Sequence, residues 1–474
     1  MADTAKTTCP NCGRLAKRIT EVEAQRAQAV ARIEQLEALL RQNSQNSSKP
    51  PSSDPPSAPA PPAKKKSKRK RGGQPGHPGH FRSLLPTEEV DRVIPVKPDA
   101  CGRCGRKLRG EDPAPQRRQV WDLPPVRPQV DEYQLHTLGC EHCGAATTAP
   151  LPEGVPAGAF GPRTLAMVAL LSGAYRLSKR AIERILADFF QMPMSLGAIP
   201  TCEKVVSAAL AEPVAEARAY VETSEVAYCD ETGWKENNKK AWLWTAVTGM
   251  VTVFMIHASR GREAARLLLG CFAGVLVSDR WHAYNMYQGL RQLCWAHLIR
   301  DFTAFSEYSG KAGRIGEQLL EKAELMFHWW HRIRDGTLQR KTFTCRMKSL
   351  RTDVERLLGR GTSCGQAKVK RACKRILKLS DALWTFVDVE GVEPTNNAAE
   401  RAARKGVLWR KVSFGTQSAE GSRFAERILT AAATCRQQGR NVLEYITEAC
   451  HAQLHGRPAP SLLPYSEDTL AQSA

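Results

Sequence analysis

Six of the 15 cysteines form three C-x2-C pairs, a spacing that places two thiols on one tight turn. Zinc binds four soft ligands in a tetrahedron, and two such pairs supply four thiolates at about 2.3 Å from the metal. Two pairs, each followed by glycine, therefore predict a closed, structural zinc site, with His136 and His142 as alternative ligands. The alternative is two unrelated pairs of free thiols. The four predicted ligands are Cys101, Cys104, Cys140 and Cys143.

The third pair, Cys9/Cys12, is half of such a site. It can bind a metal together with a second copy of the chain or with His77 and His80, or it can be free. We expect the remaining cysteines to be small buried apolar residues, because a cytosolic chain keeps its thiols reduced.

Two aspartates end short apolar runs that predict strands. Val226–Asp230 is the first expected strand and Val275–Asp279 is the fourth, in the order strand-strand-strand-helix-strand. If these two strands are neighbours, their carboxylates emerge side by side. Mg2+ is held by one or two carboxylates together with substrate phosphate oxygens. Two such ions, about 3.5–4 Å apart, serve in-line phosphoryl displacement.

A third carboxylate would help to hold the metal pair, and Glu400 is the candidate. It lies in the first turn of an expected helix, after Pro394–Asn397, whose asparagines are good N-caps. Strand-end carboxylates often only cap turns, and the spacing of the three residues does not separate these two readings.

Strands and helices alternate around these carboxylates. A turn at Glu236–Lys239 is expected to join the first two strands. Strands are predicted at 226–230, 241–248, 251–257, 275–279 and 292–295, and helices at 261–269 and 296–305.

Helical periodicity extends on both sides of this region. Apolar residues that recur every three or four positions predict three amphipathic helices over 311–388. Three more helices are expected at 162–175, 178–190 and 197–210, and they fit either a helix-turn-helix or a plain packing unit. Their basic side chains are Lys179, Arg180, Arg184 and Lys204.

The N-terminal part carries repetitive and biased segments. A heptad seam over residues 19–40 predicts a coiled coil or a solitary amphipathic helix. Residues 43–63 are rich in Gln, Asn, Ser and Pro and predict a flexible linker. Seven of the eight residues in 64–71 are basic, which we interpret as a DNA-backbone tether, although charge runs are often only solvated. Two β-like runs are predicted at Val90–Val96 and Gln129–Thr137. The β-like sequence between the two C-x2-C pairs can form a ribbon that brings the two turns together.

The charge balance indicates a polyanionic partner. The sequence has 69 Lys plus Arg and 48 Asp plus Glu, a net charge of +21, and 42% hydrophobic residues. This composition excludes collagen-like and wholly disordered proteins, and no apolar run approaches the roughly 20 residues that span a bilayer. The N-terminus lacks the apolar core of a signal peptide, so we expect a cytoplasmic protein that binds nucleic acid.

The sequence resembles the transposases of the bacterial insertion sequence 66 family over nearly its whole length. The matching segments are LLRQNSQNSSKPPSSD (Leu39–Asp54), KRGGQPGHPGH, the paired cysteine turns, DETGW (Asp230–Trp234), VSDRWHAY (Val277–Tyr284), CWAHLIRDF (Cys294–Phe302), PTNNAAERAARKG (Pro394–Gly406), WRKVSFGTQSAEGSRF (Trp409–Phe424) and the terminal LLP.

The resemblance implies an α+β multidomain protein with an RNase H-like mixed α/β catalytic core and an all-α insertion. It implies a DDE triad of Asp230, Asp279 and Glu400 that binds Mg2+ or Mn2+, and DNA cleavage at transposon ends followed by strand transfer. His297 and Arg300 match a family motif and are expected to face the active site or DNA, although His297 fits a structural role equally well. Trp234 and Trp295 are expected in the core.

The expected partners are double-stranded DNA, as transposon ends and target, a second copy of the chain, and small accessory transposition proteins. Basic residues from four segments are expected to contact DNA. They are Lys64, Lys65, Lys66, Lys68, Arg69, Lys70, Arg71, Lys179, Arg180, Lys204, Arg300, Arg401, Arg404, Lys405, Arg410 and Lys411.

Two other functions remain open at the level of sequence: an inactive zinc-containing DNA-binding protein derived from a transposase, and a site-specific nuclease without strand transfer. The expected division is a coiled-coil helix (1–42), a linker and basic tether (43–82), a zinc-binding domain (83–152), a helical DNA-binding unit (153–220), a catalytic core (221–425) with a helical insertion (310–390), and a C-terminal helical region (426–474).

Overall fold

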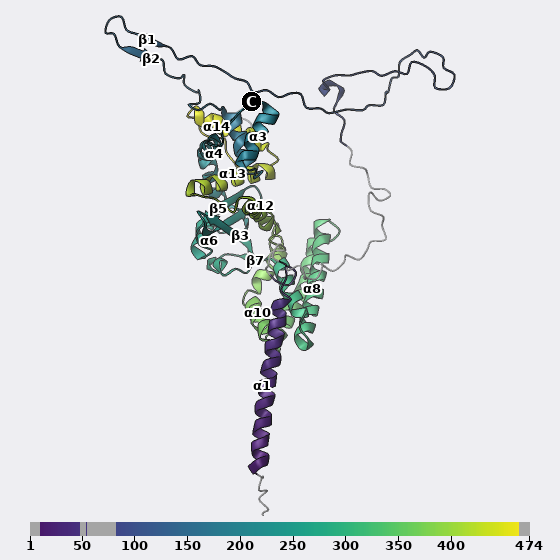
Figure 1. Cartoon of the computed structure of the whole chain (residues 1–474). Coiled ribbons are helices and arrows are strands. Elements are labelled where there is room, and N and C mark those ends of the chain that lie inside the picture. Colours follow the sequence, from purple (N-terminus) through teal and green to yellow (C-terminus); the bar gives the residue numbers. More distant parts are fainter. Residues whose placement is uncertain (1–9, 48–53, 55–81, 464–474) are drawn as a thin grey trace, which may run out of the picture. The chain divides into compact units, whose positions relative to one another are not determined.

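The computed structural model describes residues 10–47, 54 and 82–463 (Figure 1). The basic run 64–71 and most of the expected linker lie outside these residues. The chain divides into two compact units, Met1–Pro59 with Gln129–Ala474, and Ala60–Pro128, and each is described by itself. Among the described residues, no helix is both long and apolar enough to cross a bilayer.

A five-stranded mixed sheet lies at the centre of the larger unit, in the order β5-β4-β3-β6-β7. The first three strands in sequence form an antiparallel meander, and β6 and β7 extend it in parallel from β3. The predicted adjacency of the first and fourth strands is therefore confirmed. The strands are β3 (Val226–Glu236), β4 (Lys239–Val247), β5 (Thr252–His257), β6 (Val275–Ser278) and β7 (Arg291–Leu293).

The turn between β3 and β4 lies where the sequence predicts it. Asn237 and Asn238 both have positive φ angles, 48° and 57°, which are the conformations of a type I′ hairpin turn. The expected end of the first strand at Asp230 is wrong, because β3 continues to Glu236 along β4. Its pairing with β6 ends at Tyr228, so Asp230 lies just beyond the shared part of the two strands.

Helices from distant parts of the sequence pack around the sheet (Figure 1). Helix α12 contacts β3 and β4, α13 contacts β5, and α6 contacts β4. Large side chains such as Trp234, Trp244 and Tyr284 are fully buried in the resulting core. The helices are α6 (Arg262–Leu269), α12 (Asn397–Ser413) and α13 (Ala419–Gln437).

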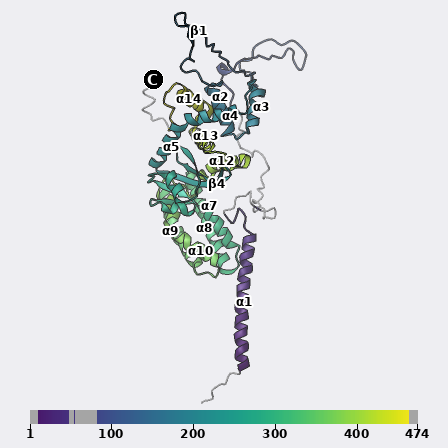
Figure 2. The same ribbon diagram turned by 60° about the vertical axis from the view of Figure 1, so that its left-hand side comes forward.

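A second core surrounds the long helices between β7 and α12, which Figure 2 shows side by side. Three long helices and the short α11 fill the segment in which three helices are predicted. Trp330, Phe343 and Phe386 pack edge-to-face or tilted among them. Trp295 is fully buried against Trp384 and joins this core. The helices are α7 (Trp295–Ser306), α8 (Gly310–Arg334), α9 (Arg340–Gly361), α10 (Ala367–Leu377) and the short α11 (Thr385–Asp388).

The three helices predicted over 162–210 are present, and a fourth, α5, follows them. The Ser178 side chain caps α3 by accepting a hydrogen bond from the Ala181 amide over 3.2 Å. Helices α2 and α4 pack against α13 and α14, so the helices that precede the sheet in the sequence share one core with the C-terminal helices. The bounds are α2 (Pro162–Ser172), α3 (Lys179–Phe190), α4 (Ala198–Ala209), α5 (Ala211–Thr223) and α14 (Val442–Leu454).

The β-like run Val90–Val96 does not form a strand, and only the last residue of Gln129–Thr137 does. The side chains of Val93 and Val96 are 66% and 89% exposed, so no buried apolar face stabilises a strand in this segment. A short hairpin, β1 (Thr137–Gly139) with β2 (Ala146–Thr148), flanks the second C-x2-C pair. In the smaller unit the described residues form one short helix, η2 (Thr87–Glu89). The heptad segment lies within α1 (Pro10–Leu40).

Candidate active site

The three predicted carboxylates come from two adjacent strands and one helix. Asp230 lies within β3, Asp279 directly follows β6, and Glu400 lies in the first turn of α12. Each residue is half-buried. The amide of Trp281 donates to Asp279 Oδ1 over 2.8 Å, which fixes this carboxylate at the end of β6.

The negative charges around Asp230 act on its carboxyl group. Burial raises the pKa of Asp230 well above its ordinary value, and the negative charges of Glu231, Asp279 and Glu400 raise it further. Among the described residues, neither Asp230 nor Asp279 forms an ion pair with a basic side chain. Carboxylate oxygens are the ligands that Mg2+ and Mn2+ prefer, so the donor atoms of these three residues are of the type that holds such ions.

Asn396 connects the elements that carry the carboxylates. Its side-chain amide donates to the Cys229 carbonyl over 2.7 Å, and its backbone amide donates to Cys294 Sγ over 3.2 Å. Asn396 occupies the N-cap position of α12, as expected, but its side chain makes no capping hydrogen bond. The expected local cap is therefore replaced by a bond to β3, because the residue is fully buried between the two elements.

Glu231 forms a second acidic site beside Asp230. Its carboxylate accepts from Arg260 over 2.8 Å and from the Tyr284 hydroxyl over 2.7 Å. Burial and the charge of Asp279 raise the pKa of Glu231 to about 7, and the hydrogen bonds from Tyr284 and Arg260 oppose this shift. Adjacent residues of a strand point to opposite faces of the sheet. The side chain of Glu231 therefore lies on the face opposite Asp230, where Arg260 and Tyr284 donate hydrogen bonds to it.

The aromatic side chains of Trp242 and Trp281 enclose Arg260. The guanidinium lies 4.7 Å from the centroid of the first ring and 3.8 Å from that of the second. This clamp orients Arg260 toward Glu231. No periodicity or spacing in the sequence indicates this clamp, since its parts come from three separate segments.

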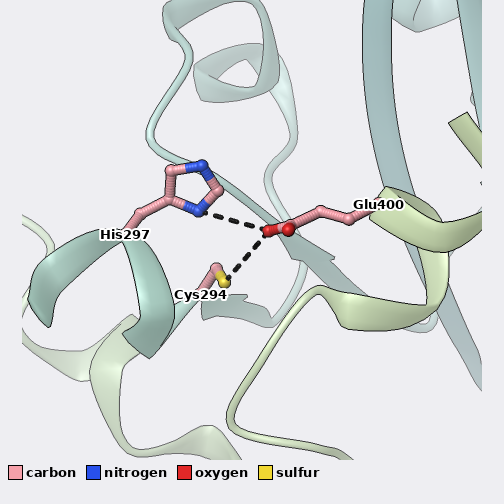
Figure 3. A group of neighbouring side chains, drawn as sticks. All are labelled: Cys294, His297 and Glu400. Atoms are coloured by element: carbon pink, nitrogen blue, oxygen red, sulfur yellow. Dashed lines mark hydrogen bonds and ion pairs between the residues drawn. The ribbon is translucent and has the colours of Figure 1, made fainter. Parts of the chain in front are cut away.

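Cys294, His297 and Glu400 meet at the start of α7 (Figure 3). Glu400 Oε1 lies 3.9 Å from Cys294 Sγ and 3.6 Å from His297 Nδ1. Burial lowers the pKa of His297, although Asp279 and Glu400 oppose this shift, and burial raises the pKa of Cys294 to about 11. The imidazole therefore lies beside the carboxylate of Glu400. Cys294 was not predicted as a site residue, although its C-x2-H spacing was visible.

The basic residues of α12 have different environments. Arg401, Arg404 and Lys411 are exposed, and the first two lie within about one helical turn of Glu400. Lys405 is half-buried, and burial lowers its pKa to about 8. The Arg410 guanidinium donates to the Gly233 carbonyl, so it is engaged with β3.

The basic residues outside α12 also differ in their environments. Arg180 is exposed, and Lys204 is exposed and lies 3.7 Å from Glu420. Lys179 forms an ion pair with Glu203. Arg300 is half-buried on α7. The seven basic residues of the 64–71 segment, like Cys9, His77 and His80, lie outside the described residues.

Both predicted zinc-binding turns have the same backbone geometry. The amides of Gly105 and Gly144 donate to the carbonyls of Cys101 and Cys140, over 2.9 and 2.8 Å. Both glycines have positive φ angles, 73° and 71°, which glycine adopts without strain. Backbone amides beside the sulfur atoms lower the pKa values of Cys101 and Cys140, which favours thiolates. Cys12 is exposed on α1.

Comparison with known proteins gives three family matches. Residues 157–424 match a family described as "Transposase IS66 family", and residues 98–144 match a "zinc-finger binding domain of transposase IS66". Residues 10–83 match a family of unknown function. "Uncharacterized protein y4qI" of Sinorhizobium fredii (strain NBRC 101917 / NGR234) is 25% identical over 260 residues, 48% of this chain and 47% of that protein. The chain thus spans about half the length of this curated relative.

Proposed function

Because the chain belongs to the IS66 family of transposases, we propose that it is a DDE transposase that cleaves transposon ends and joins them to target DNA. The observation that carries the proposal is the effect of the Asp279 and Glu400 charges on Asp230, together with the lack of an ion pair to either aspartate among the described residues. Buried structural carboxylates are normally paired with a basic group, so two aspartates without an ion pair fit a site that holds metal ions.

An RNase H-like core is part of this proposal. Three antiparallel strands, followed by two strands that continue the sheet in parallel, support it, as does α12 packed on β3. In this arrangement the helices α8 to α10 are an insertion between β7 and the helix that carries Glu400. The insertion accounts for the long sequence separation between the second and third carboxylates.

The proposed reaction is phosphoryl transfer without a covalent enzyme intermediate. Bound at the three carboxylates, two Mg2+ or Mn2+ ions would activate the attacking oxygen and stabilise the leaving oxygen. Asp230, Asp279 and Glu400 would hold these ions, and the protein contributes mainly positioning and charge stabilisation. Water is the nucleophile for cleavage, and the freed 3′-hydroxyl is the nucleophile for attack on target DNA.

Exposed arginines beside the carboxylates are the proposed phosphate contacts. Arg401 and Arg404 lie on the same helix as Glu400, so their guanidinium groups are available to a DNA backbone at the cluster. Arg180, Lys204, Arg300, Lys411 and the basic run 64–71 would extend this contact. Lys179 and Arg410 would contribute less because each is bound to a group of the chain, and Lys405 would contribute less because burial lowers its pKa to about 8.

Zinc at the C-x2-C turns is a second part of the proposal. The match to a zinc-finger binding domain over 98–144, and the same knuckle geometry at Cys101 and Cys140, support four thiolate ligands. Such a site has no open position, so it would stabilise the fold and take no part in the chemistry.

Association of two chains through α1 is a third part. The seam residues Ile19, Val22, Ile33 and Leu36 are 57%, 57%, 55% and 45% exposed, so α1 presents an uncovered apolar stripe. A heptad seam of this kind fits a second copy of the same helix, because identical seams interdigitate as knobs into holes. Pairing two chains would allow two transposon ends to be handled together.

Product analysis separates a transposase from a nuclease with the same site. Purified protein, Mg2+, labelled transposon-end DNA and a target plasmid would be incubated together. The proposal predicts end cleavage and labelled ends joined to the plasmid. Cleavage without joined product would favour the nuclease, and binding without cleavage would favour the inactive DNA-binding protein.

A further inference from the structure

Cys294, His297 and Glu400 place three different metal-ligand atoms around one point (Figure 3). The Cys294 sulfur, a ring nitrogen of His297 and a carboxylate oxygen of Glu400 all lie within 4.8 Å of one another. Cys294 is the N-cap of α7 and His297 lies in its first turn, so one short segment presents the sulfur and the nitrogen together. Glu400 reaches them from α12.

The two separations from Glu400 are close to those of a tetrahedral zinc site. Zinc bonds of about 2.0–2.3 Å place ligand atoms about 3.4 to 3.6 Å apart at tetrahedral angles. Glu400 Oε1 lies 3.9 Å from Cys294 Sγ and 3.6 Å from His297 Nδ1. Small side-chain movements would therefore complete the geometry without moving either helix.

The imidazole nitrogen has no competing partner. His297 Nδ1 is buried and forms no hydrogen bond among the described residues. A buried polar nitrogen without a partner is costly, and metal coordination would satisfy it. Cys294 Sγ accepts from the Asn396 amide over 3.2 Å, a contact that a metal-bound sulfur retains.

We propose that Cys294, His297 and Glu400 form a binding site for a thiophilic divalent cation of the zinc class, distinct in ligand type from the magnesium site but sharing Glu400 with it. A thiolate with an imidazole selects zinc or cobalt over Mg2+, which prefers oxygen ligands. Binding releases the thiol proton to solvent, and three protein ligands leave a fourth position for water.

The shared carboxylate has a consequence for catalysis, and this consequence alone rests on the proposed function. A zinc-class ion that engages Glu400 withdraws a ligand from the magnesium site. Zinc would therefore inhibit cleavage supported by Mg2+, and the C-x2-H segment would act as the inhibitory site.

The binding test uses Co2+ as the probe, because thiolate–Co2+ absorption reports the sulfur ligand directly. Full-length protein would be dialysed against Co2+, and bound metal would be measured by atomic emission for wild type, Cys294→Ser and His297→Ala. Wild type is expected to bind one ion per chain more than either variant. Cys202→Ser replaces a cysteine that is 2% exposed, compared with 1% for Cys294, and should match wild type.

His297→Ala retains the contact between Cys294 and Asn396, so it keeps the test decisive if Cys294→Ser is poorly folded. Equal Co2+ stoichiometry and affinity in wild type and His297→Ala would overturn the site. A loss of at least about 100-fold in affinity is expected for each variant.

Inhibition is measured separately, as the Zn2+ concentration that halves each protein's own Mg2+-dependent cleavage. This concentration is expected to rise about 100-fold in Cys294→Ser. Cobalt binding without zinc inhibition would overturn the overlap of the two sites. Absence of any cleavage in Mg2+ would instead contradict the proposed function, and the binding result would be unaffected.

Discussion

The side-chain amide of Asn396 donates a hydrogen bond to the carbonyl oxygen of Cys229 over 2.7 Å. This bond joins the residue before helix α12 to the residue before Asp230. Since Glu400 lies one turn into α12, the distance between its carboxylate and that of Asp230 depends on this junction. The contact is fully buried, so water cannot replace it.

Replacing Asn396 with alanine should therefore loosen the carboxylate cluster. We expect the free energy of unfolding to fall by about 1–3 kcal/mol, because the Cys229 carbonyl loses its buried donor. Cleavage should fall about 10-fold, equivalent to about 1.4 kcal/mol in the barrier, and half-maximal activity should need more Mg2+. A Mg2+ titration of the cleavage rate measures both effects.

Asn441→Ala is the matched control, because Asn441 caps α14 through its side chain. It should lower stability by about 1 kcal/mol without changing the Mg2+ requirement. The same Mg2+ requirement for Asn396→Ala and wild type would refute a positioning role for the junction.

Local signals and long-range packing explain what the sequence could and could not predict. Strand periodicity and the Asn-Asn turn predicted the hairpin of β3 and β4, and helical periodicity predicted α8 to α10. The extension of β3 beyond Asp230 was missed, because it depends on pairing with β4 rather than on local propensity. Val90–Val96 has strand-like composition but no layer to bury it, so its prediction failed.

The three carboxylates were predicted as candidates, but the contacts that place them were not. The Asn396–Cys229 bond and the approach of Cys294 to Glu400 join residues more than a hundred positions apart. Such contacts follow from how helices pack on the sheet, and no spacing in the sequence encodes them. The clamp of Trp242 and Trp281 around Arg260 was missed for the same reason.

The pKa of Asp230 predicts a pH-dependent effect of metal on stability. In the folded protein the pKa of Asp230 lies well above its ordinary value of 3.8, so the folded state binds this proton more tightly than the unfolded state. Without metal, the free energy of unfolding therefore falls as pH rises through the raised pKa. Mg2+ compensates the ionised cluster. We expect Mg2+ to raise the melting temperature more at pH 8 than at pH 5, as measured by calorimetry.

Asp230→Asn removes the buried charge, so without metal it should be more stable than wild type at pH 8. Mg2+ should also raise its melting temperature by less. Asp353→Asn should instead be less stable than wild type at pH 8, because Lys322 and Arg356 lower the pKa of Asp353 and stabilise its charge. Equal Mg2+ shifts at both pH values in wild type would be inconsistent with a metal-binding cluster.

Two substitutions on the apolar stripe of α1 test self-association. Ile33→Asp and Leu36→Asp together should convert a dimer to a monomer, since each places a charge in the heptad seam. Light scattering after size exclusion measures the mass. Ala24→Asp adds a charge at an exposed position of α1 outside the seam, and should leave the dimer intact. A wild-type monomer at micromolar concentration would argue against the seam as an interface.

Arg401→Ala and Arg404→Ala test the phosphate contacts beside Glu400. Each should weaken binding of transposon-end DNA and lower the slope of log affinity against log salt by about 0.9, the value for one lost phosphate contact. Fluorescence anisotropy over a salt series measures the slope. Arg356→Ala, which removes an arginine already paired with Asp353, should change neither quantity. An unchanged slope in both α12 variants would exclude them from the DNA contact.

The most direct test of a DDE site is cleavage of labelled transposon-end DNA in Mg2+ by wild type, Asp279→Asn and the paired-aspartate control Asp353→Asn. Wild type and Asp353→Asn should cleave at similar rates. Asp279→Asn should bind the DNA but cleave it at least about 100-fold more slowly, because one metal ligand is lost. Cleavage by Asp279→Asn at the wild-type rate would contradict the assignment of Asp230, Asp279 and Glu400 as the catalytic carboxylates.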